Sequence, residues 1–291
     1  MAIMLPLQAA LGRPPHEATV AARICCYHNE PYRKIAWQIT NRCHLRCPYC
    51  FTPERDSRDL TYEACVRLLN SLRTLFPHKD RLLFAGREPL LHDSILNVLS
   101  HANTLGYRCS LSTSGELLNA NTVEELCNRG LQKVNVTVNA ADSSAHAASR
   151  PGGRLARVLD GIRFVRATGM ILKVNVTLVD KAATDLTDTL RLLAELDVRR
   201  VSVSFLHPAG PKRGMGPAFT HEALHAIQAA ASRAQLPLAH IHVIAPPEHG
   251  PCSNHDMCPA SRGLVAVLPD GTITQCNIFP FAFPSHGVPH E

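Results

Sequence analysis

Aromatic residues and long apolar runs are both scarce in this sequence. Aromatic side chains make up 5% of the 291 residues, and the lysines and arginines behind the net charge of +6 are scattered along the chain. Proteins that bind nucleic acid gather their basic residues and often add aromatic side chains that stack on bases, so this composition argues against a nucleic-acid partner. No apolar run reaches the ~18 residues that cross a bilayer, which argues against a membrane partner.

A secretory signal and a disulfide framework are also missing from the pattern. The first dozen residues have no basic start, and Arg13 and the two following prolines interrupt them. Cysteines number 11, and six of them form two groups with the spacing of metal ligands: Cys43, Cys47 and Cys50, then Cys252, Cys258 and Cys276. This usage fits a reducing compartment better than disulfides, so we expect a cytoplasmic protein.

Strand-like and helical segments alternate along most of the chain. With 45% hydrophobic residues, the sequence can bury a sizeable core. Buried strands are predicted at 34–40, 81–85, 107–112, 133–138, 171–178 and 200–205, with an amphipathic helix after each of the first five. This alternation predicts an α/β fold with a parallel sheet. Six such units are fewer than the eight of a closed barrel, so we expect a partial, open (β/α)6 TIM-like barrel.

Changes in hydrophobic periodicity and in proline and glycine content predict three regions. Residues 1–33 are predicted to form an N-terminal arm, and residues 34–210 to form the partial barrel. A stretch rich in proline and glycine then begins the last region, 211–291, a hinge followed by a small C-terminal subdomain. Within that subdomain, the turn signal Pro269-Asp270-Gly271 predicts a hairpin.

The first cysteine group has the spacing C-x3-C-x2-C and directly follows the strand 34–40. Three thiolates at this spacing can bind three irons of a [4Fe–4S] cluster, which leaves one iron open to a small molecule. A zinc site is the alternative, with His44 as its fourth ligand.

This cysteine run, with Tyr49 before its last cysteine, resembles the signature of the radical S-adenosylmethionine (SAM) superfamily. The resemblance implies that Cys43, Cys47 and Cys50 hold the catalytic cluster. It also implies reductive cleavage of SAM to a 5′-deoxyadenosyl radical, which abstracts a hydrogen atom from the substrate. The cofactors carry that chemistry while the protein binds, orients and shields them.

Other strand ends carry motifs similar to those of the same family. The run 86–89, Gly-Arg-Glu-Pro, is similar to the family's G-G-E-P but has Arg87 in place of the second glycine. Thr113-Ser114-Gly115 looks like T-N-G, and 136–139 followed by Arg150 looks like V-S-L-D with its downstream arginine. The resemblance implies a SAM pocket built from Tyr49, Gly86, Glu88, Thr113, Ser114, Thr137, Asn139 and Arg150. His207, at the end of the sixth strand, is a further candidate there, either to shuttle a proton or as an ordinary loop histidine.

The second cysteine group resembles the start of the SPASM and twitch domains, which hold auxiliary [4Fe–4S] clusters. Cys252, Cys258 and Cys276 are then the expected ligands, with a fourth from His255, Asp256, the C-terminal tail or the substrate. A zinc knuckle that includes His255 is the alternative, and thiols without any metal are another.

The resemblance implies an oxidoreductase of biosynthesis that acts on a small-molecule intermediate, with dehydrogenation or bond formation as a net oxidation. It also implies an external electron donor of the flavodoxin or ferredoxin type. A ribosomal peptide maturase with a short peptide substrate is the alternative within the enzymes. A non-catalytic iron–sulfur sensor is the alternative from another class, and Arg87 is the residue that keeps it open.

Overall fold

The computed structural model describes residues 23–24, 33–50, 52, 59–179, 186–206, 220–237, 240–244 and 263–274. Its strands form one ten-stranded sheet in the order β1-β8-β7-β6-β5-β4-β3-β2-β9-β10. The strands are β1 Arg23–Ile24, β2 Lys34–Thr40, β3 Arg81–Gly86, β4 Arg108–Thr113, β5 Lys133–Thr137, β6 Ile171–Leu178, β7 Val201–Phe205, β8 Ile241–Ile244, β9 Val265–Val267 and β10 Ile273–Thr274. The helices are α1 Tyr62–Leu75, α2 Ile95–Thr104, α3 Ala120–Asn128, α4 Ser143–Ser149, α5 Leu155–Arg166, α6 Leu186–Glu195 and α7 His221–Arg233, with a 3-10 turn, η1, at Pro89–Leu91.

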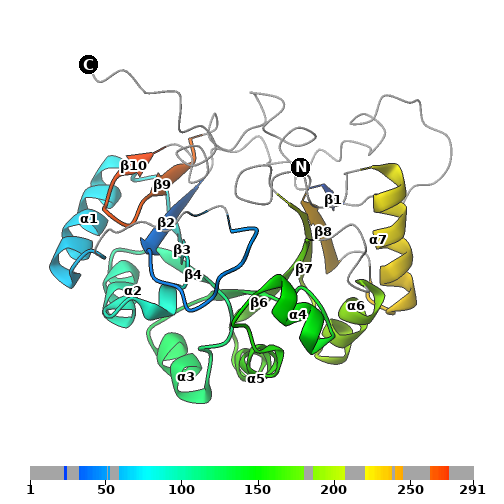
Figure 1. Cartoon of the computed structure of the whole chain (residues 1–291). Coiled ribbons are helices and arrows are strands. Elements are labelled where there is room, and N and C mark those ends of the chain that lie inside the picture. The colour runs from blue at the N-terminus through cyan, green and yellow to red at the C-terminus, as the bar shows by residue number, and fades with distance from the viewer. Residues whose placement is uncertain are drawn as a thin grey trace, which may run out of the picture.

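The sheet is curved into an open half-barrel. Neighbouring strands are parallel from β1 through to β9, and only the β9–β10 hairpin is antiparallel. The long helices lie outside the curve of the sheet, and the loop after β2 crosses its concave side (Figure 1). The expected α/β fold with an unclosed parallel sheet is confirmed, and each of the six predicted strands matches one of β2–β7.

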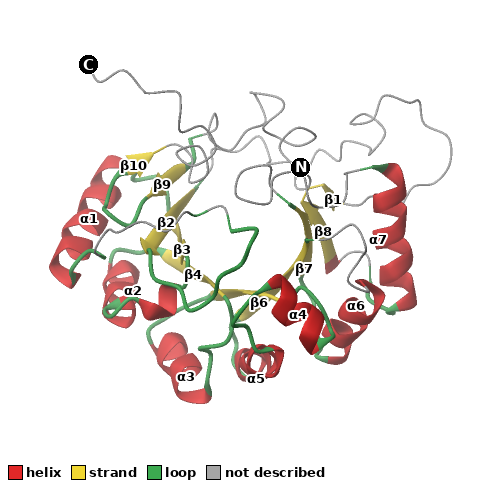
Figure 2. Ribbon diagram, in the orientation of Figure 1, coloured by secondary structure: helices red, strands yellow, loops and turns green. Residues whose placement is uncertain are grey.

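Figure 2 shows that the curved sheet has an outer side covered by helices and a concave side. Along strands such as β5, buried and partly buried residues alternate between these two sides. Val134 and Val136 of β5 are fully or almost fully buried and belong to the same apolar core as Val158 and Ile162 of α5. The alternate residues of the same strand, Lys133, Asn135 and Thr137, are polar and only partly buried. Because successive side chains of a strand point to opposite faces, the polar positions line the inside of the half-barrel.

Three features were not predicted from the sequence. The short helix α4 lies within the segment between β5 and α5 that was interpreted as a loop. β8 pairs with β7 and extends the parallel sheet, although the sequence placed it beyond the hinge. β9 pairs with β2 at the other edge, so the predicted hairpin at 269–271, which is confirmed, is attached directly to the barrel. Among the described residues, no helix combines the length and apolar character needed to cross a membrane.

Candidate SAM and iron–sulfur site

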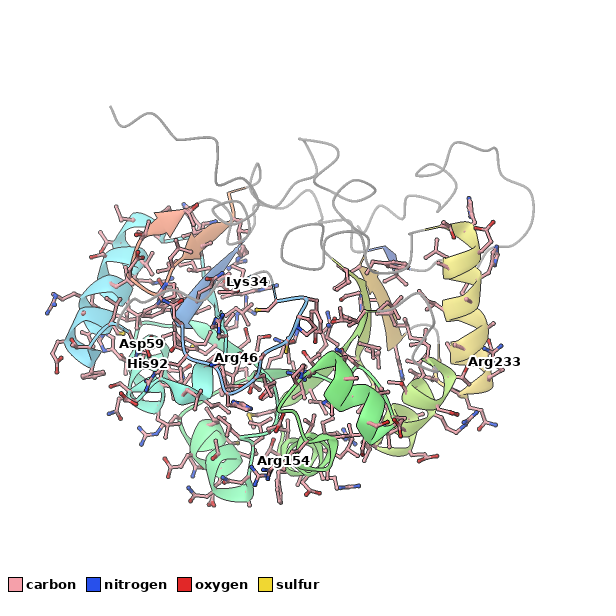
Figure 3. All side chains as sticks on the ribbon, viewed as in Figure 1. Lys34, Arg46, Asp59, His92, Arg154 and Arg233 are labelled. Carbon is pink, nitrogen blue, oxygen red and sulfur yellow. The ribbon has the colours of Figure 1, made fainter. Side chains whose placement is uncertain are left out.

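The cysteine loop is held on the C-terminal edge of the sheet by the turn that follows α4. The Arg46 amide donates to the Pro151 carbonyl at 3.2 Å, and Leu45 is buried. Gly152 has a φ of +89°, and a Cβ atom there would lie 3.3 Å from the His44 carbonyl oxygen. A glycine at this position therefore lets the turn approach the loop closely. In Figure 3, Arg46 marks the loop on the concave side of the sheet.

The three thiols of the loop are partly buried and close enough to influence one another. Burial raises the pKa of Cys43, and the charges of Cys47 and Cys50 raise it further. The Leu45 amide points at Cys43 Sγ at 3.4 Å. Backbone amides aimed at sulfur stabilise the negative charge of an iron–sulfur cluster. This donor set fits a [4Fe–4S] cluster.

A compact site for one metal ion does not form here. Among the described residues, no three His, Cys, Asp or Glu side chains are gathered around a point that could hold a metal ion. A zinc ion needs such a tight set, whereas cluster ligands surround a larger body of irons and sulfides. His44 is also turned elsewhere, since its Nε2 lies 3.9 Å from Glu116 Oε1. The choice between zinc and a cluster at this loop therefore stays a prediction.

Arg87 stands beside the last cysteine without backbone strain. The residue with positive φ in its turn is Gly86, at +114°, and Arg87 is not among the residues with positive φ in the described chain. One guanidinium nitrogen of Arg87 donates to the Thr52 carbonyl at 3.4 Å. Cys50 Sγ contacts the same carbonyl at 3.5 Å. The pKa of Cys50 is raised by burial, and the charge of Arg87 partly offsets this increase.

Gly86 makes room for the end of β2. A Cβ atom on it would lie 2.8 Å from the Thr40 carbonyl oxygen, closer than real side chains allow. The pairing of β2 with β3 shifts register at the same place, between Gln38 and Thr40. Glycine is thus required where the cysteine loop leaves the sheet.

Glu88 is fully buried and joins the ends of β3 and β4. Its Oε1 accepts from Thr113 Oγ1 at 2.7 Å, and its Oε2 accepts from the Ser114 amide at 2.7 Å. A buried carboxylate is stable only when it is hydrogen-bonded in this way. These bonds bring two of the predicted SAM motifs together on one edge of the sheet.

Arg150 and Asn139 connect the same edge to the cysteine loop. The buried guanidinium of Arg150 donates from Nη1 to the Thr137 carbonyl at 2.6 Å and to the Ser114 carbonyl at 3.4 Å. Asn139 Nδ2 donates to the hydroxyl of Tyr49 at 2.7 Å. Burial raises the pKa of Tyr49, so this hydroxyl stays neutral.

Arg150 Nε and Glu116 Oε1 at this edge are buried without a hydrogen-bond partner among the described residues. Buried polar atoms of this kind usually meet a ligand, an ion or water. A cation beside a carboxylate suits an amino acid, and SAM carries both an amine and a carboxylate. The residues therefore fit a [4Fe–4S] cluster with SAM beside it.

Sequence reasoning missed several polar residues that shape this site. Glu116 follows the T-S-G motif and faces His44. Asp59 accepts hydrogen bonds from Thr40 Oγ1 at 2.7 Å and from Arg42 Nε at 2.9 Å, which fixes the start of the cysteine loop. In Figure 3, Asp59 and His92 lie beside each other near this start. Neither carboxylate belongs to a local pattern, so only the fold reveals them.

The remaining predicted site residues lie outside the described residues. They are His207, Cys252, His255, Asp256, Cys258 and Cys276. The second cysteine group and the proton-shuttle role of His207 therefore stay predictions, as do the ligand roles of the first group.

Comparisons with known proteins agree on one family. The model of the Radical SAM superfamily matches residues 37–193, which is more than half of the chain. An AdoMet-dependent heme synthase of Methanosarcina barkeri is 29% identical over 182 residues, which are 61% of this chain and 52% of the relative. A PqqA peptide cyclase of Streptomyces rochei is 33% identical over 144 residues, 48% of this chain and 39% of the relative. The chain spans about half the length of the curated relatives it matches.

The fold is also that of solved structures in this family. SuiB of Streptococcus suis, bound to precursor peptide SuiA, superposes with a TM-score of 0.71 at 15% identity, covering 89% of this chain and 62% of SuiB. At this identity the likeness concerns the fold alone. The matched family model covers the cysteine loop and all the described strand-end motifs. The chain therefore belongs to the radical SAM superfamily of enzymes, whose domain uses a [4Fe–4S] cluster together with SAM.

Proposed function

We propose that this protein cleaves SAM reductively and abstracts a hydrogen atom from a substrate, with Cys43, Cys47 and Cys50 as the ligands of the catalytic cluster. The observation that carries the proposal is the hydrogen bond of 2.7 Å from Asn139 to Tyr49. It joins the loop that supplies the thiols to the strand ends that would hold SAM. When bound, the cluster supplies an electron and SAM supplies the group that abstracts the hydrogen atom.

The residues of the chain have separate tasks in this proposal. Arg150 would bind the carboxylate of SAM through its unpartnered Nε, because a guanidinium and a carboxylate form strong charge-assisted hydrogen bonds. Glu88 fixes the ends of β3 and β4 relative to each other, and these ends would contact the rest of SAM. Thr137 positions Arg150 through its backbone carbonyl. The loop partly shields the three thiols from water.

For the substrate we propose a small biosynthetic intermediate that undergoes a net oxidation, with an external donor of the flavodoxin or ferredoxin type. Similarity to the heme synthase of Methanosarcina barkeri supports a small molecule. A short peptide is the second candidate, and the likeness to SuiB bound to precursor peptide SuiA favours it. A reducing cytoplasm would keep the thiols of the loop available for the cluster.

An auxiliary [4Fe–4S] cluster on Cys252, Cys258 and Cys276, within the region 211–291, is a further part of the proposal. It rests on the spacing of these cysteines alone. Anaerobic reconstitution should yield ~8 irons per chain if this cluster forms and ~4 if only the first one does. A value near four together with one equivalent of zinc would favour a zinc knuckle instead.

The proposed function predicts that SAM binds directly at the first cluster. The EPR spectrum of the reduced, reconstituted protein should therefore change when SAM is added. In Cys47→Ala the signal of that cluster should be absent, while any auxiliary signal remains as an internal control. A cluster that forms normally but whose spectrum ignores SAM would contradict the proposal and favour the sensor alternative.

A further inference from the structure

His146, on the short helix α4, is a buried titratable side chain outside the set of residues assigned to SAM so far. None of its surface is exposed, and neither ring nitrogen has a hydrogen-bond partner among the described residues. A buried polar group without a partner costs free energy, so such a group usually meets a ligand, an ion or water. The imidazole of His146 is therefore a candidate for contact with a bound molecule.

Arg150 is the charged neighbour of His146. It follows His146 by one helical turn, and its amide donates to the His146 carbonyl at 2.9 Å. Residues four positions apart lie on the same face of a helix, and both of these side chains are buried. Burial, and after it the charge of Arg150, lowers the pKa of His146 to about 4. The imidazole and the guanidinium thus share one buried environment.

The guanidinium of Arg150 forms no ion pair with an aspartate or glutamate among the described residues. Its Nη1 atom donates to the carbonyls of Thr137 and Ser114, which are neutral, and its Nε atom is buried without a partner. An unpaired buried charge is unfavourable, so this group is suited to bind an anion. Two neighbouring side chains, Arg150 and His146, thus each carry an unpartnered nitrogen, which suits an anion with two acceptor oxygens.

The neutral ring of His146 can add a hydrogen bond there without adding a charge. With a pKa of about 4 the ring is uncharged at about pH 7, so one nitrogen donates a hydrogen bond and the other accepts one. A second cation beside Arg150 would be repelled, whereas a neutral N–H is not. The backbone of α4 holds the residue in place, because the His146 carbonyl also accepts from Ser149 Oγ at 2.8 Å. Ser149 Oγ in turn accepts from Asn139 Nδ2 at 3.3 Å.

We propose that His146 binds the carboxylate of SAM together with Arg150, one oxygen accepting from the imidazole N–H and the other from Arg150 Nε. This inference rests on the proposed function, because that function brings SAM to this edge of the sheet. A carboxylate has two acceptor oxygens, so it can satisfy both unpartnered groups at once. It also supplies the negative charge that the buried guanidinium lacks. A buried water at His146 is the alternative, and the affinity for SAM would then not depend on this residue.

The test is the affinity of the reduced, reconstituted full-length chain for SAM, from titration of the EPR signal of the cluster. Leucine resembles histidine in size but has no donor, so His146→Leu should weaken SAM binding about 10-fold or more. Its melting temperature without SAM should stay the same or rise, because leucine removes a buried polar group that has no partner. His146→Asn and His146→Gln keep an N–H donor, and at least one of them should bind SAM within about threefold of the original.

Tyr107→Phe is the matched control. It also removes a buried polar atom that has no hydrogen-bond partner among the described residues, but this atom belongs to the residue directly before β4, at the opposite end of that strand from Thr113. Its affinity for SAM should stay within about twofold of the original. A second probe is decarboxylated SAM, which lacks the carboxylate. It should bind the original chain and His146→Leu equally.

Three results would overturn the role of His146 and leave the proposed function intact. Unchanged affinity for SAM in His146→Leu would mean that the ring does not contact SAM. Equal weakening for SAM and for decarboxylated SAM would mean that its contact is not with the carboxylate. A lower melting temperature in all three variants of His146 would mean that the ring serves packing. By contrast, a cluster signal that ignores SAM in the original chain would contradict the proposed function as well.

Discussion

At the scale of single residues, the hydrogen bond between Asn139 and Tyr49 connects the cysteine loop to the strand ends. The two residues are 90 positions apart, and Asn139 also accepts from the Thr177 amide at 3.1 Å, so it joins β6 to the cysteine loop. Asn139 is almost fully buried. Its side chain is therefore held in place and can orient the loop before any ligand binds.

We predict that Asn139→Ala and Tyr49→Phe each weaken SAM binding about 5- to 10-fold, and that the double variant is hardly worse than either single one. Both changes remove the same hydrogen bond, so their effects should not add. The measurement is the affinity for SAM, from titration of the EPR signal of the reduced cluster. Full additivity would mean that the two side chains act separately and that their bond does not position the loop.

Lys133 gives a prediction about the pH dependence of stability. Its pKa of about 8 in the folded protein lies below its ordinary value of 10.5. Between these values the unfolded chain binds more protons than the folded one, so the free energy of unfolding gains from Lys133 as pH rises. Below pH ~8 the charged group is destabilising by the full amount. We therefore expect Lys133→Met to stabilise the protein at about pH 7 by roughly 1–2 kcal/mol, once solvent screening is allowed for.

Urea unfolding of both proteins at about pH 7 and about pH 10 tests this expectation. The advantage of Lys133→Met should shrink at the higher pH, since the lysine is then mostly neutral in the folded protein. Arg163→Met provides the control for losing an exposed cation, and its effect should not depend on pH in this range. If Lys133→Met were less stable than the original protein at pH 7, burial and the neighbouring cations would not destabilise the charged form of Lys133.

Much of the site was predictable at the residue scale, and the reasons differ from case to case. The cysteine loop and the run 86–89 are local motifs whose spacing is visible in the sequence. Glu116 and Asp59 were missed because each acts across the fold on a residue far away in the sequence. Arg87 replaces the second glycine of the family motif without backbone strain, because Gly86 takes the positive φ.

At the scale of the secondary-structure elements, the turn after β4 shows how tightly the site is packed against α5. Gly115 has a φ of +94°, and a Cβ atom on it would lie 2.6 Å from Val136 Cγ1 and 3.1 Å from Val158 Cγ1. From the side of the helix, a Cβ atom on Gly161 would lie 2.6 Å from the Gly115 carbonyl oxygen. Helix α5 and the turn after β4 are thus in close contact at Gly161 and Gly115.

We predict that Gly115→Ala destabilises the protein by roughly 2–4 kcal/mol, because both the backbone conformation and the space are unsuitable for a side chain. Gly169→Ala is the matched control, since nothing lies within 4 Å of a Cβ atom there. That change should be neutral or slightly stabilising, by up to about 1 kcal/mol. Thermal unfolding measures both. Similar losses in the two variants would mean that the turn is not tightly packed.

The periodicity of apolar residues predicted most elements well, since it reflects local geometry. The helix α4, Ser143–Ser149, was missed because it consists of serines, alanines and one histidine and shows no apolar stripe. Its one local signal is Asp142, whose side chain accepts from the Ala145 amide at 2.8 Å as a helix N-cap.

At the scale of the whole molecule, the sheet places the two ends of the described chain at its opposite edges. β1 adds to β8, whereas β9 and β10 add to β2. Pairings between strands so distant in sequence cannot be predicted from local patterns, because each depends on the curvature of the complete sheet. The parallel order of β2–β7 was predictable, since strands that alternate with helices have few other ways to pair.

The same architecture separates two chemical environments. Thiols and the predicted SAM residues gather at the C-terminal edge, where parallel sheets of this class place their ligands. Lys133, whose pKa is lowered to about 8 by burial and by the charges of neighbouring lysines and arginines, begins β5 at the opposite, N-terminal edge of the sheet. A variant of Lys133 should therefore leave SAM binding at the C-terminal edge unchanged.

The most direct test of the central claim is the formation of 5′-deoxyadenosine. The anaerobically reconstituted protein is reduced with dithionite, given SAM, and the products are measured by liquid chromatography. We expect release of 5′-deoxyadenosine from the original chain and none from Cys47→Ala, which lacks one ligand of the cluster. Equal amounts from both proteins, or no product from a chain that demonstrably carries its cluster and binds SAM, would contradict the assignment of Cys43, Cys47 and Cys50 to reductive SAM cleavage.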